Sequence, residues 1–379
     1  MCQGAFAERG LLVRAAKGSS KLVTDIDIIA HDYSINFTHT RFYAECKSGR
    51  NVSTLDRVVW IKGMMHLVGA NIGYFIIDKC DPDSVAFALS QNVNVLQEDG
   101  LKALEAALKI SSSFWPGRSN IRVYDEYTDL MIKELRSKTD LTFNQWLYSA
   151  SISWRESPAL VFSYGKLNTL IGLLSDIPHV LKSADISGDR EKIMKFAVAA
   201  LLVRFSQFVL FAAGDTLGMT KTERERYLAM KLTVGDNDVD HAKKLLNGAL
   251  DLAKAKLEDA KASVPTHWTA DYLLTPPPYA KAFAELIERI IEDGTRSRLL
   301  PLAMEILLFG FSGSEKGSSQ LIRRVEYALQ PTSVVKAFVA QSLKIPDAYF
   351  KGPDSRADVK KPSLSGNGNG NAGKQPSLL

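Results

Sequence analysis

Charged side chains recur at two-residue spacing in two apolar segments near the start of the chain. Asp25 and Asp27 lie in the first segment, and Glu45 and Lys47 lie in the second. Two-residue spacing puts each pair on one face of a β-strand. Burying a carboxylate costs free energy unless a cation or a hydrogen-bond partner compensates it. If the two strands are neighbours, we expect two carboxylates and one ammonium group to converge.

That grouping suits hydrolysis of a phosphodiester bond. Mg²⁺ takes hard oxygen ligands, commonly one or two carboxylates plus water and a substrate phosphate. A bound ion can lower the pKa of water, and a neighbouring lysine can orient that water or offset developing negative charge. The same three side chains, Asp27, Glu45 and Lys47, could instead form a structural ion-pair cluster on a half-exposed sheet.

Alternation and capping signals define the elements that would position these residues. Residues 22–30 alternate well as a strand, and residues 41–47 form the next one, after a polar connection. Residues 2–9 are expected to end a helix at Gly10, before a strand over 11–15. Further along, the pattern indicates a helix over 54–68 capped by Ser53, a strand over 74–78, a helix over 84–91, a strand over 93–96 and a helix over 99–110.

Three other residues near the expected site have simpler interpretations. Cys46 lies between Glu45 and Lys47, so it is expected on the opposite face of the strand, in the core. His31 and His39 flank the polar connection and are expected to be solvated.

The N-terminal segment resembles the PD-(D/E)XK nuclease superfamily, which includes restriction endonucleases and archaeal Holliday-junction resolvases. It is most similar to the Mrr-like branch. Three features carry the resemblance: the expected helix–Gly10–strand lead-in, the Asp-Ile-Asp strand at 25–27, and Glu-Cys-Lys at 45–47, followed by a helix and an apolar strand. The resemblance covers about residues 4–98.

The resemblance implies roles for particular residues. Asp27 and Glu45 would be ligands of Mg²⁺ or Mn²⁺, and Lys47 would be the catalytic lysine acting on DNA. Asp25 is the alternative to Asp27 and otherwise a supporting residue. The first helix of the family is usually longer and often supplies a glutamate, a position that Glu8 would fill unless it is a surface residue.

The chain divides into three parts by sequence character. The resemblance implies an α/β N-terminal domain over 1–110, with a restriction-endonuclease-like mixed sheet flanked by helices. Strand signals fade after Ser111, so an all-α domain is expected over 111–350. Residues 351–379 contain repeated Gly-Asn and are expected to be a disordered tail. Helices are expected at 125–137, 158–174, 190–213, 220–231, 238–261, 279–293, 299–309, 318–329 and 333–342.

Composition limits the other function classes. The net charge of +5 comes mainly from the last 29 residues, with five Lys and Arg against two Asp and Glu, so bulk charge does not argue for DNA binding. Residues 196–213 are apolar but contain Arg204, which favours a buried core helix over a membrane span. Three scattered cysteines and no signal peptide fit a reducing, cytoplasmic setting.

The sequence leaves two functions open. One is a DNA endonuclease whose helical domain serves targeting or homo-oligomerisation. The other is a catalytically inactive nuclease-fold protein that acts as a nucleic-acid-binding or assembly module.

Overall fold

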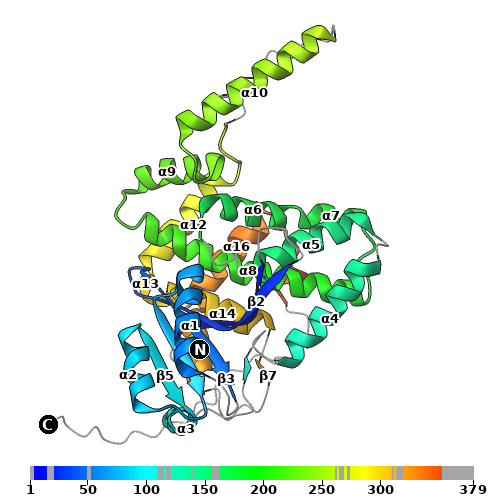
Figure 1. Cartoon of the computed structure of the whole chain (residues 1–379). Helices are drawn as coiled ribbons and strands as arrows, with labels where there is room; N and C mark the ends of the chain where they lie inside the picture. The colour runs from blue at the N-terminus through cyan, green and yellow to red at the C-terminus, as the bar shows by residue number, and fades with distance from the viewer. Residues whose placement is uncertain are drawn as a thin grey trace, which may run out of the picture.

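The structure is a computed structural model of the 379-residue chain. It describes residues 4–14, 21–48, 53–108, 115–116, 121–137, 140–155, 162–260, 263, 269–270, 274–309, 311–312 and 319–351. The tail expected over 351–379 therefore lies almost entirely outside the described residues. Figure 1 shows an N-terminal sheet with its helices beside a larger helical region.

A five-stranded mixed sheet forms the N-terminal domain, as the sequence predicted. The strands lie in chain order: β1 (Phe6–Arg14), β2 (Leu22–Tyr33), β3 (His39–Lys47), β4 (Ile72–Ile77) and β5 (Val93–Gln97). The first three form an antiparallel meander, whereas β3, β4 and β5 are parallel. The parallel pairs are joined by helices, as such crossovers require.

Helices border this sheet. α1 (Thr54–Val68) and α2 (Pro82–Ser90) pack on one face, where Ile61 and Met65 of α1 share a core with Tyr43 and Phe75. α3 (Glu98–Ala107) follows β5, and its Leu101 lies beside Cys46 and Ile76, on the other face of the sheet. The Ser53 side chain accepts a hydrogen bond from the Asp56 amide, which confirms the predicted cap of α1.

The expected lead-in helix is wrong, because residues 6–14 form strand β1. Arg9 pairs with Ile28 and Leu11 pairs with Ile26, so the strand runs straight through Gly10. Gly10 has a φ of 64°. A glycine with positive φ occurs both at the end of a helix and inside an irregular strand, so the glycine alone could not decide between a helix and a strand here. Strand β2 is longer than β1, so β1 pairs with it from Phe6 to Arg14.

The larger region is helical and confirms the predicted change of character. Its main elements are α4 (Ile121–Ser137), α5 (Leu141–Arg155), α6 (Tyr164–Ser175), α7 (Ile177–Ser183), α8 (Asp189–Asp215), α9 (Lys221–Val234), α10 (Val239–Asp259), α12 (Ala280–Glu292), α13 (Gly294–Ser297), α14 (Leu300–Phe309), α15 (Ser319–Tyr327), α16 (Leu329–Ser342) and η4 (Asp347–Phe350). The helix expected to start at residue 158 begins at Tyr164, and α5 and α7 were not predicted. Short strands β6 (Trp115–Pro116) and β7 (Phe311–Ser312) pair with each other.

Helix α8 runs through the centre of the helical core. It is the only described helix long and apolar enough to cross a membrane, and 94% of its most apolar 18-residue window is buried inside the protein. Side chains of the N-terminal domain, Phe6, Tyr33 and Phe37, belong to the same core as α8. The expected boundary near residue 110 therefore separates two kinds of secondary structure, while the packing continues across it.

Candidate active site

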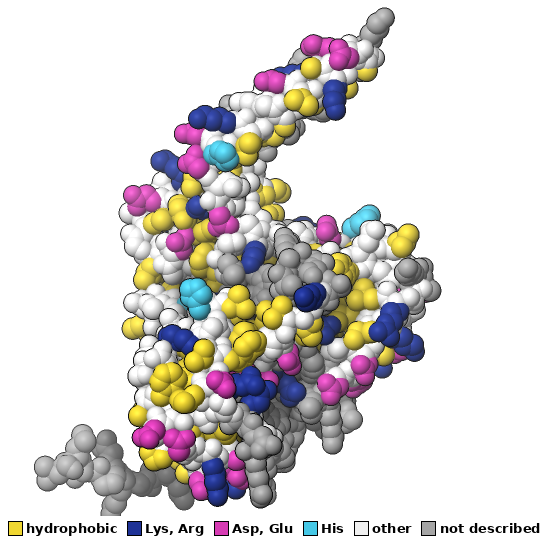
Figure 2. Space-filling view, viewed as in Figure 1, with side chains coloured by type: hydrophobic (Ala, Val, Ile, Leu, Met, Phe, Trp, Pro, Cys, Tyr) yellow, Lys and Arg dark blue, Asp and Glu magenta, His cyan; other side chains and the backbone are white. Residues whose placement is uncertain are grey.

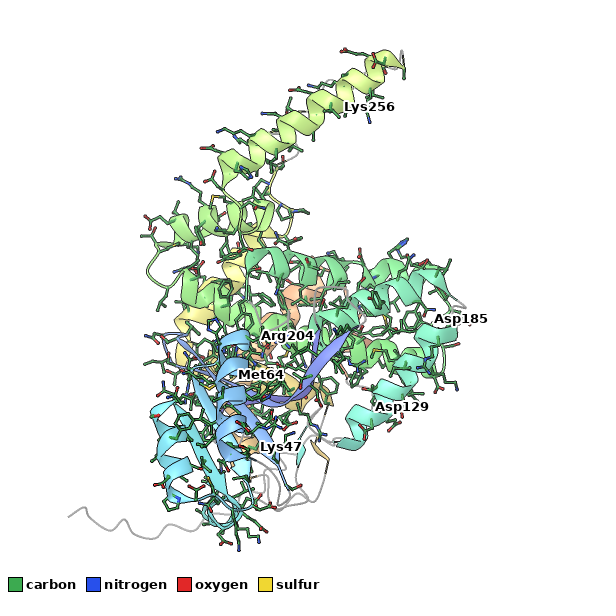
Figure 3. The ribbon with its side chains drawn as sticks, viewed as in Figure 1. Lys47, Met64, Asp129, Asp185, Arg204 and Lys256 are labelled. Atoms are coloured by element: carbon green, nitrogen blue, oxygen red, sulfur yellow. The ribbon has the colours of Figure 1, made fainter. Side chains whose placement is uncertain are left out.

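The structure brings Asp27, Glu45 and Lys47 together on neighbouring strands. Ile28 of β2 pairs with Ala44 of β3, and Asp27 and Glu45 are the next residues along the two strands. The Asp27 Oδ2 atom accepts a hydrogen bond of 2.8 Å from the Cys46 amide. The Lys47 Nζ atom lies 3.3 Å from Glu45 Oε1. Figure 3 shows Lys47 on the sheet domain.

Glu45 is the best-anchored residue of this site. Its side chain is only 5% exposed, while that of Lys47 is 36% exposed. The Tyr43 hydroxyl donates a 2.6 Å hydrogen bond to Glu45 Oε2. Arg57, in the first turns of α1, donates a 3.0 Å hydrogen bond to Glu45 Oε1. The buried carboxylate is thus compensated by two cations and one hydroxyl.

The negative charge at this point acts on the neighbouring groups. Burial raises the pKa of Tyr43 well above its ordinary value, and its hydrogen bond to Glu45 and the charges of Glu45 and Asp27 raise it further. Partial desolvation of the thiol at the sheet surface, together with the charges of Asp27 and Glu45, raises the pKa of Cys46 to about 11. The charges of Asp27 and Glu45 therefore both raise the pKa of Tyr43 and of Cys46 on β3.

Tyr43 and Arg57 were missed by the sequence reasoning. Tyr43 precedes Glu45 by two residues, so strand alternation could have placed it on the same face. Arg57 belongs to helix α1, and no local sequence signal shows how this helix is oriented on the sheet. Cys46 does lie on the opposite face, but it is exposed rather than in the core, because this part of the sheet is open beside Ile76 and Leu101.

The two supporting residues lie elsewhere. Asp25 is exposed on β2, opposite Leu12 of β1, and the structure does not draw it into the Glu45 cluster. Glu8 is on β1, where its Oε1 accepts a 2.9 Å hydrogen bond from Arg204 of α8. The expectation that Glu8 stands on a lead-in helix is wrong, as is its interpretation as a surface residue, since it is only 8% exposed.

His31 and His39 are not solvated loop residues. They lie in β2 and β3, their rings stack at 5.1 Å, and His31 Nδ1 is 3.0 Å from His39 Nε2. Glu8, His31 and Arg204 together form a buried polar contact between the sheet and the helical core.

The chain was compared with protein-family models, curated proteins and solved structures, and none of them matches it. The likeness to PD-(D/E)XK nucleases therefore rests on the motif residues of β2 and β3, and it stays a prediction.

Proposed function

We propose that the chain is a metal-dependent DNA endonuclease that hydrolyses phosphodiester bonds. The observation that carries this proposal is the arrangement of acidic and basic groups on adjacent strands β2 and β3. Asp27 accepts a hydrogen bond from the amide of Cys46, the residue between Glu45 and Lys47, and Lys47 contacts Glu45. A cytoplasmic role in defence or DNA processing, with a helical region used for targeting, extends the proposal by family analogy.

The donor set fits a Mg²⁺ or Mn²⁺ ion. Asp27 and Glu45 supply carboxylate oxygens, the ligands that these hard cations prefer. Cationic groups already gather at Glu45 Oε1, which marks this atom as a place where positive charge is stabilised. When bound, the ion would polarise the scissile phosphate and lower the pKa of a water molecule. Asp27 and Glu45 would hold it.

The protein's own residues have separate tasks in this site. The Cys46 amide fixes one oxygen of Asp27, and the Tyr43 hydroxyl fixes one oxygen of Glu45, so both carboxylates are oriented before substrate arrives. Lys47 is exposed enough to reach a phosphate, where its ammonium group offsets the developing negative charge. Arg57 donates to Glu45 Oε1, and its side chain is 31% exposed, so it would be able to turn towards the DNA backbone if an ion took its place at that oxygen.

The test is DNA cleavage with Mg²⁺ or Mn²⁺, on plasmid and on single-stranded substrates. Lys47→Met and Glu45→Gln should each lower the cleavage rate by about a hundredfold or more, because each removes a group that acts in the transition state. Lys62→Met is the matched control, since Lys62 is an exposed lysine on α1 that donates to the Gln91 carbonyl. Cleavage that survives both site substitutions would disprove the assignment.

One observation favours a second function, that of an inactive nuclease-fold module for binding or assembly. Lys47 Nζ and Arg57 Nη1 lie 3.3 Å and 3.0 Å from Glu45 Oε1, so side chains of the protein itself already compensate the Glu45 charge. In this alternative, Lys47 and Arg57 neutralise Glu45 permanently. Absence of both cleavage and Mn²⁺ binding, combined with a lower melting temperature for Glu45→Gln, would support it.

A further inference from the structure

Helix α10 (Val239–Asp259) projects from the helical region as an arm (Figure 1). Its 21 residues give it a length of about 30 Å at the α-helical rise. Leu250 is the only described side chain of this helix that is buried. A helix of this length normally buries an apolar face, because packing supplies most of its stability. The arm therefore has surface that the described part of the chain leaves uncovered.

An apolar stripe runs along the exposed surface of α10. Leu245 and Leu252 lie seven residues apart, so they share one helix face, and they are 63% and 64% exposed. Gly248 and Ala249 lie between them and are also exposed. Apart from the backbone of the helix itself and the two neighbouring residues, no atom lies within 4 Å of the position that a Cβ of Gly248 would take, so a second backbone can approach closely there. We call these four residues the α10 stripe, and apolar side chains are visible along the arm in Figure 2.

The charge of α10 selects the class of partner. The helix carries four lysines, at 243, 244, 254 and 256, and four acidic residues, at 240, 251, 258 and 259. Because these charges balance, the arm gains little from the phosphates of DNA or from an anionic membrane. A partner helix that also has equal numbers of positive and negative charges and an exposed apolar face matches this surface better.

Lys244 and Asp251 border the stripe and have opposite charges. In an antiparallel pair of α10 helices related by a two-fold axis near Gly248 and Ala249, Leu245 of one copy faces Leu252 of the other. The same arrangement places Lys244 of each copy beside Asp251 of the other, which gives two ion pairs. A two-fold axis requires this kind of self-complementary surface.

We propose that α10 is a dimerisation arm whose partner is α10 of a second copy of this chain, packed antiparallel along the α10 stripe. Pairing buries four leucine side chains that are exposed in the single chain, and each buried leucine favours association. The dimer would hold two copies of the sheet domain, and this inference does not depend on the proposed nuclease activity.

Sedimentation equilibrium of the full chain over a wide concentration range tests the proposal. The wild type should reach twice the chain mass of 41.8 kDa, whereas Leu252→Glu and Leu245→Glu should stay at 41.8 kDa. Circular dichroism should show unchanged helix content, because both leucines are exposed. Leu141→Glu is the control, since Leu141 is 69% exposed on α5 and its replacement should leave the dimer intact. A wild type that is monomeric at every concentration overturns the proposal, as does a Leu252→Glu dimer.

Charge reversal tests the antiparallel orientation. Lys244→Glu and Asp251→Lys should each weaken the dimer, because each places like charges together across the interface. The double variant should restore dimerisation, since it exchanges the two signs. A double variant as weak as either single variant overturns the antiparallel arrangement.

Discussion

The Glu8 carboxylate accepts a 2.9 Å hydrogen bond from the Arg204 guanidinium, although the two residues are 196 positions apart in the chain. Glu8 lies on the first strand of the sheet and Arg204 lies in the middle of α8, and they are 8% and 2% exposed. Gln207 also accepts a hydrogen bond from Arg204, at 2.5 Å. This contact ties the edge of the N-terminal sheet to the centre of the helical core, as the position of Arg204 in Figure 3 illustrates.

Removing either partner of this pair should destabilise the whole protein. Arg204→Ala would leave the buried Glu8 carboxylate without this cation. Glu8→Ala would leave the buried Arg204 guanidinium without this carboxylate. Breaking a buried pair from one side typically costs about 3–5 kcal/mol. Urea unfolding of each variant should show this loss of the free energy of unfolding.

The double variant Glu8→Leu/Arg204→Met is the informative comparison. It removes both charges together and should recover much of the stability lost in the single variants. Lys102→Ala, which breaks an exposed pair with Glu98 on α3, should leave the unfolding midpoint nearly unchanged. Single Glu8 or Arg204 variants as stable as Lys102→Ala would contradict the role of the buried contact.

The buried histidines next to Glu8 predict loss of stability in acid. Burial lowers the pKa of His31 from 6.5 to about 4, against the opposing effect of Glu8. Burial also lowers the pKa of His39 to about 3, helped by His31 and Arg41. Below pH 6.5 the two histidines are protonated in the unfolded chain but stay neutral in the folded chain. The free energy of unfolding therefore falls as the pH drops towards 4 and 3.

The size of this effect can be measured by chemical unfolding at a series of pH values. His31 alone should account for a loss of roughly 3 kcal/mol between pH 7 and pH 4. His39→Phe keeps a ring in the stack with Tyr33 and cannot be protonated, so it should reduce the pH dependence between 6.5 and 3 and leave the contribution of His31. An acid profile that does not change in His39→Phe would contradict this account.

Much of the sheet was predictable because its signals are local. The alternation of residues 22–30 and 41–47 identified β2 and β3, and Ser53 identified the start of α1. β1 was mistaken for a helix because its evidence is the pairing with β2, which no local pattern contains. Helices α5 and α7 were missed for a similar reason, since their burial is set by the core around α8.

The site was predictable in part. Strand alternation and the pairing of β2 with β3 place Glu45 next to Lys47 and bring Asp27 to the Cys46 amide between them. The role of the three residues as a metal site stays a prediction. The anchoring of Glu45 by Arg57 could not be predicted, because it depends on how α1 lies across the sheet. Glu8 could not be placed either, since its partner Arg204 belongs to a helix far along the chain.

Two glycines should respond oppositely to substitution by alanine. A Cβ on Gly294 would lie 2.5 Å from the Ile35 carbonyl oxygen, where α13 meets the loop between β2 and β3. Gly294→Ala should therefore destabilise the protein by about 1–3 kcal/mol. Gly172 lies inside α6 with open space around its Cβ position, so Gly172→Ala should stabilise it by about 0.5–1 kcal/mol. Thermal unfolding of both variants checks this; equal effects would contradict the packing at Gly294.

Arg57 should compete with a metal ion for Glu45. It donates to Glu45 Oε1 at 3.0 Å, and its side chain is 31% exposed, so it can move away. Arg57→Gln should bind Mn²⁺ several-fold more tightly than the wild type, because one cation no longer occupies that oxygen. Weaker binding in Arg57→Gln would mean that the arginine supports the metal site instead.

The account depends most on Asp27 and Glu45 forming one divalent-cation site. Calorimetric titration of Mn²⁺ into the full chain tests this directly, beside Asp27→Asn, Glu45→Gln and the control Asp25→Asn. The account predicts one bound ion in the wild type and in Asp25→Asn, and its loss in both Asp27→Asn and Glu45→Gln. A wild type that binds no Mn²⁺, or binding that both substitutions leave intact, would contradict it.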